Sequence, residues 1–128
     1  GNAGLFSNAE DLAVIFQMLL NGGTYGGTTF LAPETIERFT AKQYKVHRGL
    51  GFDKPREKRR SSTHAKDASA TTFGHTGFTG TCVWADPQHN LIFILLTNRV
   101  HPNKYNRQLN RLDIRLKMHQ VVYDALIE

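Results

Sequence analysis

The chain has 128 residues, a formal net charge of +5 and a hydrophobic share of 40%. This length provides one domain at most, with enough apolar residues for a core. No apolar run approaches the roughly 18 residues that a membrane-spanning helix needs. The single cysteine, Cys82, excludes an internal disulfide, and its apolar neighbours predict a buried structural thiol.

The chain starts at Gly1 rather than at a methionine, and its first residues show no charged and then apolar leader. We therefore expect a processed or shortened chain, and this end gives no prediction of localisation.

The first helix is predicted by a capping box in which Ser7 is the N-cap and Glu10 reaches back to it. Apolar residues then follow at helical spacing and form one stripe: Ala9, Leu12, Ala13, Phe16, Leu19 and Leu20. The sequence Asn-Gly-Gly at 21–23 tolerates positive φ angles and ends the helix.

A second helix is expected to begin at Pro33, because proline suits the first helical position. Leu31 and Ile36 are spaced as a hydrophobic staple across its start. We expect Ile36 and Phe39 to point inward and the helix to end near Lys42.

The positive charge is concentrated between residues 54 and 67, where six basic residues stand against two acidic ones and leave +4. The basic residues are Lys54, Arg56, Lys58, Arg59, Arg60 and Lys66. Such a cluster can bind nucleic acid, but no aromatic residue lies among them to stack on bases. The pattern therefore predicts that residues 54–71 form a solvated, poorly ordered loop. We expect no nucleic-acid partner.

Four short strands are predicted, at residues 49–52, 72–75, 79–86 and 91–97. The last is apolar at every position from Leu91 to Leu96, which is typical of a strand covered by helices on both faces. A long helix over residues 109–127 is expected to present one apolar face: Leu109, Leu112, Leu116, Val122 and Leu126, widened by Ile114, Met118, Val121 and Ala125. The order of elements predicts an α+β fold with an antiparallel sheet of about three to four strands, packed by N-terminal and C-terminal helices.

A candidate site edge lies in residues 73–80, where a glycine recurs at every third position. Glycine weakens a strand and often marks a bulge or the close approach of a ligand. Polar residues alternate with these glycines: His75, Thr76 and Thr79. This pattern indicates an accessible backbone edge with groups that exchange protons, although His75 could also be an ordinary strand histidine.

The triplet His75-Thr76-Gly77 resembles the Lys-Thr-Gly signature of the serine β-lactamase-related family, in which many members carry His in place of Lys. That family contains penicillin-binding proteins, class C β-lactamases, D-alanyl-D-alanine peptidases and esterases. Residues 1–7, running into 11–13, are similar to its Gly-Gly-Leu-x-Ser helix entry, and residues 95–99 and 49–52 match two further segments. The resemblance covers most of this chain but only the last part of the family's domain.

The resemblance implies a partial β-lactamase/DD-peptidase-like fold, no cofactor, and a periplasmic or extracellular location. In the family, the Ser of a Ser-x-x-Lys motif forms an acyl-enzyme, assisted by the Lys and by the Tyr of a Tyr-x-Asn motif. By the same resemblance His75 assists at the nucleophile, Thr76 contacts the carboxylate or acyl region of the substrate, and the N–H of Phe78, after Gly77, donates to the oxyanion. Since histidine titrates near neutral pH and lysine does not, the replacement favours an esterase or amidase over an efficient β-lactamase.

The nucleophile motif is missing from this sequence. No serine has lysine three positions later, and no tyrosine has asparagine two positions later. We expect the serine and lysine on an N-terminal part of the domain, so that this chain alone is inactive and exposes apolar surface prone to self-association. The six histidines show no metal-ligand spacing, so no metal site is predicted.

Two functions of different class are consistent with the sequence. One is the C-terminal portion of a serine hydrolase acting on peptidoglycan peptides, β-lactams or small esters and amides. The alternative is a non-catalytic module that binds an acidic partner through the basic residues from Lys54 to Lys66.

Overall fold

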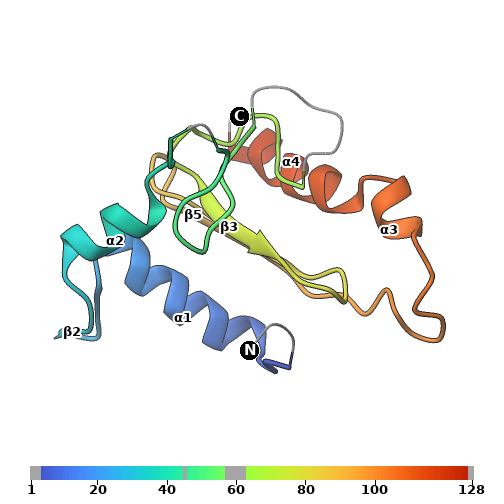
Figure 1. The fold of residues 1–128 in the computed structure, drawn as a ribbon, viewed down its shortest axis with the longest axis horizontal. Helices are drawn as coiled ribbons and strands as arrows, with labels where there is room; N and C mark the ends of the chain where they lie inside the picture. The colour runs from blue at the N-terminus through green and yellow to red at the C-terminus, as the bar shows by residue number, and fades with distance from the viewer. Residues whose placement is uncertain (1–3, 45, 57–62, 127–128) are drawn as a thin grey trace.

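A computed structural model of the protein describes residues 4–44, 46–56 and 63–126 (Figure 1). Its helices are α1 (Ala9–Leu20), α2 (Pro33–Thr40), α3 (Gln108–Arg111) and α4 (Ile114–Leu126). Its strands are β1 (Thr24–Tyr25), β2 (Thr28–Thr29), β3 (Phe73–Thr76), β4 (Cys82–Asp86) and β5 (Leu91–Leu95). The first two pair as a small hairpin, and the last three form an antiparallel meander in the order β3-β4-β5. The predicted α+β class is confirmed.

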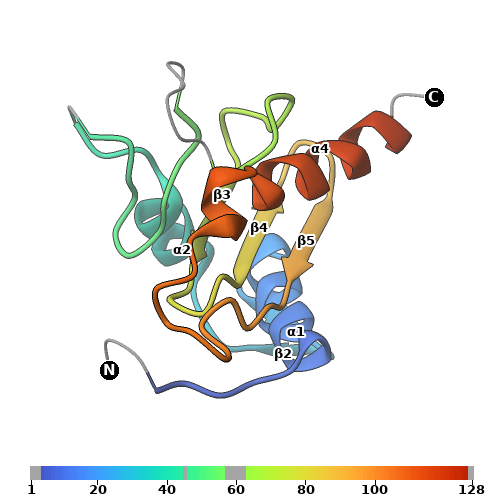
Figure 2. The same cartoon turned by 90° about the vertical axis from the view of Figure 1, so that its right-hand side faces the viewer.

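The meander lies between two helices, with α1 on one face and α4 on the other (Figures 1 and 2). On the α1 face, the Phe16 ring stacks on Phe73 with centroids 6.2 Å apart. On the α4 face, Trp84 and Phe93 form the core with Cys82. The prediction that helices cover both faces of the apolar strand is confirmed, but the strand buried along its whole length is the central one, β4, rather than β5.

Helix α1 begins one residue later than the capping box predicted. Its N-cap is Asn8, not Ser7, and the Asn8 side chain accepts a hydrogen bond from the backbone N–H of Asp11 at 2.9 Å. Asp11 is the third helical residue, and its carboxylate accepts a hydrogen bond from the side-chain amide of Asn8 in return. A reciprocal cap therefore forms one position later than predicted. No residue of α1 is fully buried in the described chain, so its apolar stripe is only partly covered.

Helix α2 begins at Pro33 as predicted, but it ends at Thr40 rather than near Lys42. Ile36 is buried, whereas Phe39 is 46% exposed, so the inward placement of Phe39 was wrong. Large apolar side chains are also exposed elsewhere: Leu5, Phe6, Phe30 and Val121.

The C-terminal helix is interrupted, which corrects the prediction of one continuous helix over 109–127. Asp113 adopts a positive φ of 51° between α3 and α4. The side of α4 that faces the sheet is also different from the predicted apolar stripe, because its buried residues are polar or aromatic: Arg115, His119, Gln120 and Tyr123. Leu112, Met118 and Leu126, expected inward, are about half exposed.

The segment that includes the basic loop contributes to the core where it is described. Ala65 and Thr72 are fully buried, and His64 packs edge-on against Trp84. Residues 57–62, with Lys58, Arg59 and Arg60, lie outside the described residues. The expected weak order of residues 54–71 therefore stays a prediction.

Cys82 is 2% exposed, and burial raises the pKa of its thiol to about 11. The predicted buried thiol is confirmed.

In the described part of the chain no helix is both long and apolar enough to cross a membrane.

His119 is buried in its neutral form. Its ring stacks on Phe93 with centroids 4.5 Å apart, and its Nδ1 accepts a hydrogen bond from the Ala65 N–H at 3.0 Å. Burial, reinforced by the nearby His64, lowers the pKa of His119 from 6.5 to about 4. The unfolded chain therefore binds this proton more tightly than the folded protein does.

Acidification from pH 6.5 towards 4 is accordingly expected to destabilise the protein. The loss is on the order of a few kcal/mol, at about 1.4 kcal/mol per pKa unit. Chemical unfolding across this range, compared between the wild type and His119→Asn, measures it, since asparagine keeps an acceptor but does not titrate. An unchanged slope in the variant would show that other groups cause the loss.

Candidate active site

His75 lies near the exposed end of β3, which is an edge strand of the described meander. It pairs with Val83 of β4 and shares with Phe73 the sheet face that α1 covers. Half of its side-chain surface is exposed. The strand ends at Thr76, one residue later than predicted, and the next strand starts at Cys82 rather than at residue 79. Residues 77–81 between them form a turn.

Two residues at the borders of the segment predicted as a strand at 49–52, Arg48 and Asp53, flank His75. That strand is not formed: Gly51 has a φ of 88°, and the segment carries only isolated bridges, of Asp53 with Arg48 and with Gly74. The Arg48 guanidinium lies 3.0 Å from Nε2 of His75, and its other terminal nitrogen lies 3.4 Å from the Asp53 carboxylate. A basic and an acidic side chain therefore surround the imidazole.

The hydrogen bonds of His75 assign its tautomer. Arginine only donates, so Nε2 accepts the bond from Arg48. The proton then lies on Nδ1, which donates to the carbonyl of Thr76 at 2.7 Å. In this arrangement His75 is a neutral imidazole, and the positive charge that a lysine would carry in the triplet is supplied beside it by Arg48.

The turn after the triplet is fixed by hydrogen bonds. The N–H of Gly77 donates to the carbonyl of Thr81 at 2.8 Å, and the N–H of Gly80 donates to the carbonyl of Gly77 at 3.1 Å. Gly80 has a φ of 103°, and a Cβ there would collide with Thr97. The glycine pattern that marked this edge in the sequence thus reflects close approach at Gly80 and a tight turn at Gly77.

Arg115 of α4 supports the turn from inside the protein. Its Nε donates to the carbonyl of Gly80 at 2.8 Å, and one terminal nitrogen donates to the carbonyl of Gly77 at 3.1 Å. The other terminal nitrogen donates to Asn110 Oδ1 at 3.2 Å. Arg115 is 9% exposed, so a buried guanidinium clamps both ends of the turn.

Phe78 projects from this turn and is 67% exposed. The Arg99 guanidinium lies over its ring at 5.1 Å from the centroid. No described residue accepts a hydrogen bond from the Phe78 N–H. This N–H is available to a ligand, three residues beyond His75 in the chain.

The structure brings three of the predicted site residues, His75, Thr76 and Gly77, to the end of β3 with Phe78 directly beyond. Sequence analysis missed Arg48, Asp53 and Arg115. The first two flank the glycine-rich segment at 49–52, and Arg115 was hidden within a helix treated as apolar on one side. Within the described ranges, no group of histidine, cysteine and carboxylate side chains could hold a metal ion.

An antiparallel meander between two helices, with His75-Thr76-Gly77 at the end of its edge strand, agrees with the resemblance to the serine β-lactamase-related family noted in the sequence. The family model described as Beta-lactamase matches residues 1–116. The chain belongs to this family.

Curated relatives include a protein named "Putative D-alanyl-D-alanine carboxypeptidase" in Escherichia coli O157:H7, 38% identical over 111 residues. The matched region is 86% of this chain but 26% of the relative, so the chain spans about a quarter of the length of such relatives. A Salmonella newport protein of the same name is 37% identical over the same length.

Solved structures agree with the family assignment. A β-lactamase from Mycobacterium bovis superposes with a TM-score of 0.70 at 25% identity, over 93% of this chain and 44% of that one. A penicillin-binding protein homologue from Caulobacter crescentus gives 0.54 at 26% identity, over 68% and 24%. The partial β-lactamase-like fold is confirmed.

Proposed function

We propose that this chain is the C-terminal portion of a serine hydrolase and forms one wall of its active site. The observation that carries the proposal is the exposed end of β3, where half of the His75 side-chain surface is exposed and the Phe78 N–H has no acceptor among the described residues. The catalytic serine and its lysine would come from an N-terminal part of the domain, because no Ser-x-x-Lys motif occurs here. This chain alone would be inactive.

The reaction would proceed through an acyl-enzyme. The serine oxygen attacks the carbonyl carbon of an amide or ester, the bond to the leaving group breaks, and the serine proton passes to that group. The Phe78 N–H would donate to the oxyanion, and Thr76 would contact the acyl or carboxylate region of the substrate. His75 would assist at the nucleophile, with Arg48 keeping Nε2 as an acceptor. Gly77 keeps the backbone accessible.

The substrate class would be peptidoglycan peptides, β-lactams or small esters and amides. Relatives named as carboxypeptidases support a peptide substrate, whereas histidine in place of lysine supports an ester or amide. Family resemblance supports a periplasmic or extracellular location. The exposed apolar side chains of α1 would contact the N-terminal part of the domain or, in its absence, a second copy.

We expect the full-length protein to be labelled covalently by a fluorescent penicillin or by a fluorophosphonate. Labelling of His75→Ala should be at least about tenfold slower, because general acid–base assistance contributes 10²–10⁴-fold. The exposed His101→Ala is the matched control and should label at the wild-type rate.

Absence of labelling by both probes would refute the hydrolase proposal. Labelling at equal rates in the wild type and His75→Ala would show that the protein is a hydrolase but that His75 is an ordinary strand residue.

A further inference from the structure

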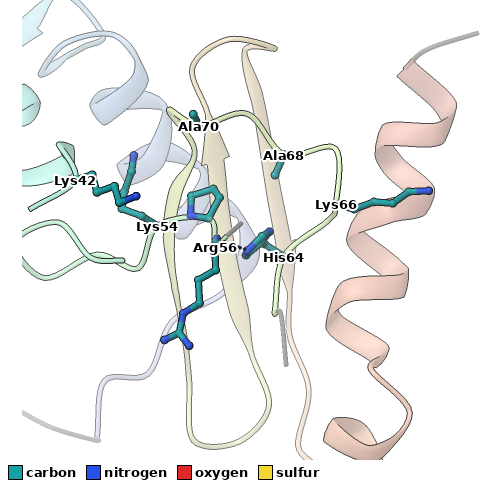
Figure 3. Close-up of a pocket in the computed structure, with 8 residues that line it drawn as sticks. Lys42, Lys54, Arg56, His64, Lys66, Ala68 and Ala70 are labelled. Atoms are coloured by element: carbon teal, nitrogen blue, oxygen red, sulfur yellow. Dashed lines mark hydrogen bonds between the residues drawn. The ribbon is translucent and has the colours of Figure 1, made fainter. Parts of the chain in front are cut away.

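A pocket lies among the segments that precede β3 in the chain (Figure 3). Its volume is about 290 Å³. The titratable residues that line it are Lys42, Lys54, Arg56, His64 and Lys66, and the remaining lining residues are Pro55, Ala68 and Ala70. No carboxylate and no aromatic ring other than the His64 imidazole is part of this lining within the described residues.

The pocket is built around cations. In Figure 3 the Lys66 side chain extends away towards α4, so the other lining cations are Lys42, Lys54 and Arg56. His64 adds no charge in this arrangement, because its Nε2 accepts the Arg56 N–H at 3.3 Å. Its ring also packs against Trp84, which fixes this wall. Like charges held together without an acid favour the binding of an anion.

Lys54 is the feature that distinguishes the pocket from a cluster of surface lysines. It is 6% exposed, and its ammonium donates to the carbonyl of Thr71 at 2.8 Å. An ammonium has three N–H donors, and among the described residues only Thr71 accepts from it. Burial lowers the pKa of Lys54 to about 8, although the carboxylate of Asp86 opposes this. Among the described residues this desolvated cation therefore has fewer acceptors than it has donors.

We propose that this pocket binds a phosphate group, with Lys54 at its base and Lys42 and Arg56 at its rim. Lysine binds phosphate as a point charge, and arginine can add a bidentate contact. No aromatic ring other than the His64 imidazole is in the described lining to stack on a base, so we take the oxyanion as the recognised group. The site is separate from His75 and does not depend on the proposed hydrolase function.

The test is titration of the full-length protein with inorganic phosphate, followed by calorimetry or by NMR of backbone amides, with acetate as a monoanion control. Lys54→Met is expected to weaken phosphate binding about tenfold or more, since a hydrogen bond to a charged group contributes roughly 1.5–3 kcal/mol. Lys117→Met, an exposed lysine on α4, removes the same charge elsewhere and should bind as the wild type does.

The fold of the variant can be checked separately. Methionine replaces a desolvated cation by an apolar chain of similar length, so Lys54→Met should keep or raise the melting temperature. If it unfolds, Arg56→Gln at the exposed rim tests the same site without touching the core, and it should also weaken phosphate binding.

Two further measurements identify the source of the phosphate and the role of the ammonium. Vesicles of phosphatidylglycerol, with phosphatidylcholine vesicles as control, test whether a lipid headgroup supplies the phosphate. If the wild type binds these vesicles and Lys54→Met does not, the phosphate belongs to a lipid. Wild-type affinity should fall between about pH 7 and about pH 10 as Lys54 deprotonates, and this fall should be absent in Lys54→Met.

The proposal is overturned if neither phosphate nor anionic vesicles bind. It is also overturned if binding is weakened equally by Lys54→Met and Lys117→Met, because that result would indicate diffuse attraction by the net charge.

Discussion

Asp86→Ala is expected to destabilise the protein by about 3 kcal/mol or more, the effect of removing one partner from a buried charged network. Asp86 is 1% exposed, and its carboxylate is the common acceptor of donors from separate parts of the chain. The Ser69 N–H donates at 3.0 Å, and so does the Gln88 N–H. His89 Nδ1 lies at 2.9 Å, and the hydroxyls of Ser69 and Tyr123 also donate.

This network joins the segment before β3, the β4–β5 turn and α4. Without the carboxylate, the Ser69 and Tyr123 hydroxyls would be buried without their acceptor. Chemical unfolding measures the loss, with Glu37→Ala on the exposed side of α2 as a control expected to change stability by less than about 0.5 kcal/mol. A loss of under about 1 kcal/mol in Asp86→Ala would show that the network is not what holds these segments together.

The charge of Asp86 also determines whether acid stabilises or destabilises the folded protein. Burial alone would raise the pKa of its carboxyl group, but the hydrogen bonds from Ser69, Tyr123 and His89 outweigh burial and lower this pKa well below 3.8. The unfolded state therefore binds the proton more readily, so this stabilisation is present above pH 3.8 and is lost as the pH falls below it. Asp86→Asn should remove this component of acid unfolding, whereas the component of His119, which acts at higher pH, should persist and grow because the Asp86 charge no longer raises the pKa of His119.

Local signals in the sequence predicted much of the fold. The helix-ending glycines after α1, the proline that begins α2 and the alternation of strands and turns from residue 72 onward depend on neighbouring residues, and each is found in the structure. The position of His75-Thr76-Gly77 at the end of a strand was also predicted, because its glycines are a local anomaly, whereas its role in a site stays a prediction. Errors in these elements are shifts of a few residues at their ends.

The remaining features could not be predicted because their causes are distant in the sequence. Asp86 is only the last residue of a predicted strand in the sequence, but it is bonded to Tyr123, which lies 37 positions away. The buried residues of α4 are mostly polar because each polar group has a partner of this kind, so a pattern based on apolar residues found Val122 but missed Arg115, His119 and Gln120. Likewise, Arg48 lies 27 positions before His75 and approaches it only through the pairing of Asp53 with β3.

Arg115→Met is expected to slow the reaction at the proposed active site, and this is the second large effect that we predict. The guanidinium donates to the carbonyls of Gly77 and Gly80, at the two ends of the turn that presents the Phe78 N–H. Methionine preserves most of the buried volume but leaves both carbonyls without this donor, which frees the turn to shift. A displacement of about 1 Å in a catalytic group can cost 10²-fold in rate, so covalent labelling of the full-length protein should slow by about that factor.

A role in positioning is separated from general destabilisation by three comparisons. Amide hydrogen exchange at Gly77 and Gly80 should accelerate in Arg115→Met while exchange in β4 does not, because only the turn loses its support. Added guanidinium ion should restore labelling in Arg115→Ala, and Arg111→Met, at an exposed position of α3, should label normally. Unchanged exchange at the two glycines would contradict the role of Arg115, whereas faster exchange without slower labelling would mean that the Phe78 N–H does not serve the oxyanion.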